Sequence, residues 1–128
     1  MRIIVVPAIL WLAVSCAWTQ EDTIPKKRLR TPAVATGFVG GESHDSYVIR
    51  AEKGRTLSVG ISWQRVGGNQ AQFTVSESPN FFDGAPATFG SESDRGRHWS
   101  GKVPKTGDLY IYVVAHPTAR YTLRVTVH

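Results

Sequence analysis

Cysteine is almost absent from this chain. Its 128 residues include a single cysteine, Cys16, so no intramolecular disulfide can form and stability must come from packing alone. Because Cys16 lies ahead of the expected folded part, a thiol nucleophile is excluded there as well. Long hydrophobic runs are also scarce, since only residues 3–14 are almost wholly apolar, and that run is too short to span a bilayer.

The motifs that usually indicate catalysis or metal binding are missing too. There is no Gly-x-Ser-x-Gly elbow, no phosphate-binding glycine-rich loop, no His-Glu-x-x-His pair and no cysteine-based zinc spacing. The histidines lie in or beside expected loops or at the terminus, and none has a second histidine at metal-ligand spacing: His44, His98, His116 and His128. The sequence therefore predicts a protein without enzymatic activity, metal ion or cofactor.

Charge gives only weak guidance about partners. The net charge of +5 favours acidic partners such as anionic polysaccharide, lipid headgroups or nucleic acid. The cationic residues are scattered, however, and the densest run, residues 26–30, begins ahead of the expected folded part. No basic stripe alternates with exposed aromatics at a nucleic-acid motif spacing, so we expect no nucleic-acid partner.

The first seventeen residues have the composition of a signal peptide. Arg2 supplies the positive start, residues 3–14 form the apolar segment, and residues 15–17 are small enough for signal peptidase. We expect signal removal after residue 17 and a periplasmic or secreted bacterial protein. An alternative is that residues 13–16 form a loose lipobox, in which case Cys16 becomes a lipid-modified N-terminus that attaches the domain to a membrane.

After the signal, residues 18–28 are expected to form a flexible leader and residues 29–128 one all-β domain. Apolar residues alternate with polar ones at a period of two, and glycine, proline, asparagine or aspartate separates the runs. The expected strands lie near residues 34–39, 47–51, 57–63, 71–75, 99–103, 109–115 and 121–127. Seven or eight short strands at this spacing predict a two-sheet antiparallel β-sandwich of jelly-roll-like form, in which Trp63 belongs to the core.

Two places in this pattern are candidate partner-binding sites. Residues 77–86 break the alternation yet carry Phe81 and Phe82 side by side, followed by Asp83, so this loop could insert aromatic anchors into a partner. Alternatively, one of the two phenyl rings covers an open end of the sandwich. Tyr110 and Tyr112 lie opposite the inward row of their strand and could bind a sugar ring or a protein, unless they serve cross-strand packing or are covered by the leader.

Several segments together resemble the bacterial pre-peptidase C-terminal domain family. The first half of the pattern is carried by residues 37–40, 45–51 and 53–59, and the second half by residues 99–113 and 121–125. These last two segments are similar to the Pro-x-x-Gly-x-Tyr and Tyr-x-Leu signatures of that family. The resemblance covers roughly residue 33 to the C-terminus, and these motifs are structural, so they support a fold more than a function.

The resemblance has one departure and one functional implication. Leu109 stands where the family usually has tyrosine, which keeps an apolar contact and loses a hydroxyl. A stand-alone exported domain of this kind is similar to the periplasmic inhibitors of g-type lysozyme, which push loops into the lysozyme cleft. That similarity implies a protein partner and a site in loop 77–86, with residues 91–97 as a second loop. The alternative is a module that binds cell-envelope polysaccharide.

Overall fold

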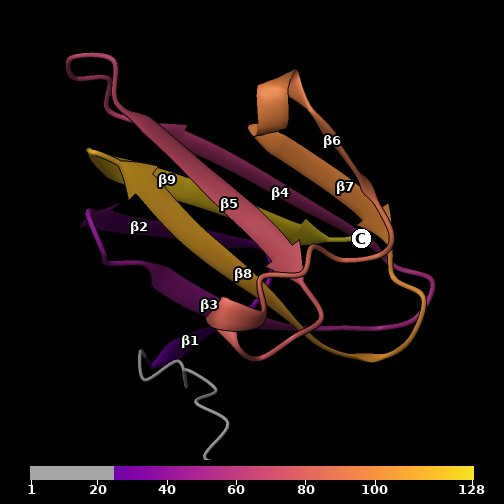
Figure 1. Ribbon diagram of the computed structural model, residues 1–128. Coiled ribbons are helices and arrows are strands. Elements are labelled where there is room, and N and C mark those ends of the chain that lie inside the picture. Colours follow the sequence, from indigo (N-terminus) through magenta and orange to yellow (C-terminus); the bar gives the residue numbers. More distant parts are fainter. Residues whose placement is uncertain (1–24) are drawn as a thin grey trace, which may run out of the picture.

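The computed structural model describes residues 25–128, which fold as two β-sheets packed face to face (Figure 1). The four-stranded sheet has the order β1 (Lys26–Leu29), β3 (Asp45–Ala51), β8 (Gly107–His116) and β5 (Gln70–Ser76). The five-stranded sheet has the order β2 (Ala33–Gly40), β9 (Thr118–Val127), β4 (Thr56–Trp63), β7 (His98–Lys102) and β6 (Ser91–Ser93). The all-β sandwich that the alternation predicts is confirmed.

Helical structure within residues 25–128 is limited to two single turns of 3-10 type. These are η1 (Phe81–Asp83) and η2 (Asp94–Gly96), and neither is long and apolar enough to cross a bilayer. The expected signal peptide, residues 1–17, lies outside the described residues, as do Cys16 and residues 18–24 of the expected leader.

The structure has one strand, β1, ahead of the first strand that the sequence predicts at residues 34–39. Residues 26–28, expected in the leader, belong to β1, which pairs with β3 as a parallel neighbour. The Arg28 guanidinium donates two hydrogen bonds to the Asp108 carboxylate, at 3.1 and 3.3 Å, and this contact lowers the pKa of Asp108 and raises that of Arg28. A charged segment thus pairs with β3 at the sheet edge, and one of its cations meets a counter-charge on β8, far away in sequence.

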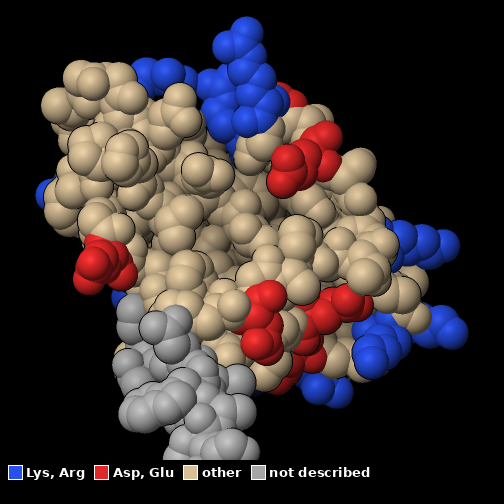
Figure 2. Space-filling view, viewed as in Figure 1, with Lys and Arg blue, Asp and Glu red and all other residues tan. Residues whose placement is uncertain are grey.

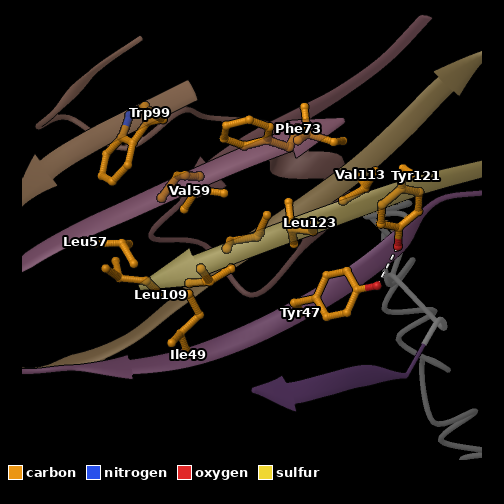
Figure 3. Packing of buried hydrophobic residues seen from close by; sticks show 14 of the residues in the cluster. Tyr47, Ile49, Leu57, Val59, Phe73, Trp99, Leu109, Val113, Tyr121 and Leu123 are labelled. Atoms are coloured by element: carbon orange, nitrogen blue, oxygen red, sulfur yellow. Dashed lines mark hydrogen bonds between the residues drawn. The ribbon is translucent and has the colours of Figure 1, made fainter. Parts of the chain in front are cut away.

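Apolar side chains from both sheets fill the space between them (Figure 3). Inward rows come from β4 and β9, which pair along seven residues, and from β3 and β8 across the layer. Burial of each such side chain contributes roughly 1.5–3 kcal/mol relative to exposure. The residues with no measurable exposure are Ile49, Leu57, Val59, Ile111, Val113, Leu123 and Val125.

A hydrogen-bonded pair of tyrosines joins the two sheets inside this core. Tyr121 on β9 donates its hydroxyl proton to Asp45 Oδ2 at 2.5 Å, and its oxygen lies 2.5 Å from the hydroxyl of Tyr47 on β3. Figure 3 shows the two rings meeting across the layer. Burial raises the pKa of both phenols, so the two tyrosines of this network stay neutral.

Gly37 makes room for this contact. A Cβ atom at that position would lie 2.6 Å from the Tyr121 hydroxyl and 2.5 Å from Asp45 Oδ2. Any side chain at position 37 would therefore push the tyrosine away from its acceptor. The alternation alone does not show why glycine stands here, but the close approach does.

We expect Tyr121→Phe to lower the free energy of unfolding by about 1–3 kcal/mol, because it leaves the partly buried Asp45 beside the core without its hydroxyl donor. Urea denaturation followed by fluorescence would measure the change. Tyr110→Phe is the matched control, since Tyr110 lies partly exposed on an outer face, and its effect should stay within about 0.5 kcal/mol. Equal stability of the two variants would contradict a stabilising role for the network.

Candidate functional site

The loop from residue 77 to residue 86 lies against the outer face of the four-stranded sheet and is held by several short polar contacts (Figure 1). Asn80 begins the η1 turn, because its side-chain oxygen accepts a hydrogen bond from the Phe82 amide at 3.0 Å. The Ser78 hydroxyl donates to the Asp83 carboxylate at 2.8 Å. Ser76, at the end of β5, donates to the Ala85 carbonyl at 2.8 Å. These contacts hold the loop in one conformation.

The two adjacent phenylalanines play different parts in this loop. Phe81 is half-buried and stacks on His44, with ring centroids 3.7 Å apart, and it meets Tyr112 edge-on at 5.5 Å. Phe82 packs edge-on against Phe81 but stays 50% exposed. Phe81 therefore covers the sheet's outer face instead of an open end of the sandwich, and Phe82 is the ring that faces solvent.

Tyr110 and Tyr112 do not form a shared aromatic platform. Tyr112 is only 3% exposed, and its hydroxyl donates to the Ser78 carbonyl at 2.5 Å, so it anchors the loop from beneath. Tyr110, on the same face, stays partly exposed next to Val48 and Asp108. Tyr112 therefore serves packing and is not a binding surface. The segment that covers its side chain is the loop 77–86.

His44 is the contributor that sequence reasoning missed. The sequence pattern predicts that His44 is an isolated surface residue. In the structure it is only 6% exposed, and its ring stacks against the buried side of Phe81. No local signal marks this role, because Phe81 belongs to a loop far later in the chain. Among the residues that the structure describes, no group of His, Cys, Asp or Glu is arranged to hold a metal ion.

The surface around η1 is acidic although the whole chain is basic. Asp83 lies next to Phe82, and Glu77 opens the loop, where its carboxylate accepts a hydrogen bond from Thr88 at 3.4 Å. Figure 2 shows Asp and Glu side chains gathered on the lower half of the face where Figure 1 places this loop. The loop thus offers an aromatic ring bordered by carboxylates.

A second concave region lies at the other expected loop, residues 91–97. This segment forms strand β6 and the η2 turn, and a cavity of about 460 Å³ opens between η2 and the start of β5. Trp63 packs against the core as expected, but it is only half-buried and also lines that cavity. Its indole N–H donates to the Asn69 carbonyl at 3.1 Å, and the Arg65 guanidinium lies 5.2 Å from its ring centroid.

Comparison with known proteins supports the fold that the motifs suggest. No family model and no curated protein matches the sequence. Among solved structures, the chain is similar to Aeromonas hydrophila PliG, a periplasmic inhibitor of g-type lysozyme, with a TM-score of 0.66 and 20% identity over 82% of this chain and 97% of that one. It is also similar to the pre-peptidase C-terminal domain of a Bacillus anthracis collagenase, with a TM-score of 0.60 and 17% identity over 83% of this chain and 99% of that one. These likenesses show a shared sandwich fold.

Proposed function

We propose that this protein is an exported, non-catalytic module that binds another protein through the loop 77–86, and that its partner is a lysozyme of the g type, which it inhibits. The observation that carries the proposal is the half-exposed Phe82 ring on a loop pinned to the sheet. The similarity to a periplasmic inhibitor of g-type lysozyme over nearly the whole of that chain supports the choice of partner.

The physical case rests on pre-organisation of the aromatic anchor. An interface gains affinity when its central aromatic ring is already in place, because little conformational entropy is then lost on binding. Phe82 meets this condition, since its amide is bonded to the Asn80 side chain and its ring packs on Phe81. Asp83 beside it accepts from Ser78, which leaves the rest of the carboxylate toward solvent for a cationic group of the partner.

Export to the periplasm or beyond belongs to the same proposal. The expected signal peptide at residues 1–17 supports it, and so does the periplasmic location that the similar inhibitor's name states. A sandwich that packs without disulfides suits either compartment, since its described core consists of apolar side chains and one tyrosine network.

We expect the purified protein to inhibit cell-wall lysis by g-type lysozyme and Phe82→Ala to weaken that inhibition about 30-fold. An aromatic anchor at an interface centre commonly carries 2 kcal/mol or more of the binding free energy, which corresponds to this factor. The measurement is the rate at which turbidity falls in a cell-wall suspension over a titration of inhibitor.

Phe38→Ala provides the matched control for this assay. Phe38 is also an exposed phenylalanine, at 60%, but it lies on β2 of the other sheet, with Arg120 over its ring at 5.6 Å. Inhibition should be unchanged in this variant. Undiminished lysis at a large excess of the unaltered protein would reject the inhibitor function, and an equal loss in both variants would reject the assignment to the loop.

The rigidity of the loop can be tested separately. We expect Tyr112→Phe to keep the fold, because the ring still fills its site, but to raise the exchange rates of the Phe82, Asp83 and Gly84 amides about fivefold. That factor corresponds to about 1 kcal/mol, the typical net value of one hydrogen bond. Hydrogen exchange followed by NMR measures it, with Tyr110→Phe as the control. Unchanged exchange in Tyr112→Phe would show that the contact with the Ser78 carbonyl does not hold the loop.

A further inference from the structure

A groove runs along the open side of the sandwich, between the edge strand β5 of one sheet and β6 with η2 of the other. The cavity of about 460 Å³ beside Trp63 continues into a second one of about 260 Å³, and the two share Phe73 and Glu92 in their linings. Figure 2 shows a hollow in the middle of this face, with Lys and Arg side chains at its upper end, where Figure 1 places η2. This groove is separate from the exposed ring of Phe82.

The wall formed by β5 is an unprotected sheet edge. Strand β5 pairs with β8 on one side, and its seven residues, Gln-Ala-Gln-Phe-Thr-Val-Ser, include no proline and no charged residue. Charges, prolines or bulges are the features that normally prevent an edge strand from pairing with another chain. By contrast, the edge strand β1 of the same sheet carries three consecutive cationic residues.

The backbone at this edge is already used once for strand-like pairing. The Ala87 amide donates to the Val75 carbonyl at 2.7 Å, so Val75 directs its backbone groups away from β8. Because successive residues of a strand alternate in direction, Phe73 and Ala71 direct their amide and carbonyl groups the same way. Within residues 25–128 no backbone hydrogen bond is formed to these groups from the open side.

The groove is cationic. Three arginines line its wider part, Arg65, Arg95 and Arg97, against the lining carboxylate of Glu92 and the adjacent carboxylate of Asp94, which leaves a formal charge of +1. Arg97 donates to the Asp94 carboxylate at 2.9 Å, and Arg65 lies over Trp63. Arg95 sits in the left-handed backbone region, with φ of 56°, a costly conformation for a residue with a side chain.

We propose that this groove binds an extended acidic segment of a partner protein, which adds a strand to the open edge of β5 and places its carboxylates among the three arginines. Strand addition takes affinity from backbone hydrogen bonds and specificity from alternate side chains. The free backbone groups of Ala71 and Phe73 supply the hydrogen bonds, and the arginines of the groove select acidic side chains. The proposal does not depend on the loop 77–86 or on a lysozyme partner.

An acidic saccharide fits these observations less well. A sugar ring would need an open aromatic face to stack on, and the Trp63 face is occupied by the Arg65 guanidinium. A saccharide would also leave the row of backbone amides on β5 without a regular partner, because its hydroxyls do not repeat at the spacing of a strand. An acidic peptide strand provides hydrogen-bond partners for the backbone of β5 and carboxylates for the arginines.

The test uses capped synthetic peptides and the purified full-length protein. The first peptide alternates glutamate with valine, the second replaces valine with proline at the same charge, the third replaces glutamate with lysine, and an oligogalacturonate represents an acidic saccharide. We expect the glutamate–valine peptide to bind about tenfold more tightly than the glutamate–proline peptide, because proline cannot donate to the edge, and the lysine peptide not to bind. Binding should slow exchange of the Ala71 and Phe73 amides and weaken with added salt.

Variants locate the binding on the protein. Arg65→Glu and Arg95→Glu should each lower the affinity for the glutamate–valine peptide about tenfold. Glu92→Gln should raise this affinity, since the substitution removes the one carboxylate of the lining. Arg124→Glu, an equal charge change at an exposed site on β9, and Phe82→Ala should leave binding unchanged. Equal affinity for the proline peptide, tighter binding of oligogalacturonate, or unchanged exchange at Ala71 and Phe73 would each overturn the proposal.

Discussion

The contact between Tyr121 and the pair Asp45 and Tyr47 sets the relation of the two sheets. Apolar packing holds the layers together but is non-directional, so it does not by itself fix how one sheet is placed over the other. A hydroxyl bridge from β9 to β3 is directional, and both of its distances are 2.5 Å. In a described domain without cysteine, this network provides the specific link between sheets that a disulfide provides in other small sandwiches.

The same principle explains why the binding loop has one conformation. A loop of this composition exposes backbone groups that need partners, and the sheet's outer face supplies them through Tyr112. Phe81 then covers His44 and Tyr112, which turns part of an outer face into a small second apolar cluster. The conformational entropy of the loop is thus lost during folding and not on binding. Phe82 remains an exposed ring on an ordered loop.

The elements that the sequence predicts well are those whose cause is local. Alternation identifies β4 and β9, because each residue's direction depends only on its neighbours in the strand. Strand β1 escapes notice because it pairs with β3 and contacts Asp108 on β8, and His44 is buried beneath Phe81; all of these partners lie later in the chain. Trp63 is a further example. Alternation predicts correctly that its side chain points inward, but the cavity beside it is formed by η2 and β5, which lie later in the chain.

Net charge illustrates how poorly an average describes a binding surface. The value of +5 suggests acidic partners for the whole molecule, yet the face in Figure 2 carries Asp and Glu side chains near η1 and a mixture of both signs near η2, where three arginines line the groove. At ordinary salt such groups are screened within about 8–10 Å, so each site meets its own partner group nearly independently of the total. An aromatic loop with carboxylates and a cationic groove with a free strand edge are therefore two distinct recognition chemistries, both built on one rigid sandwich.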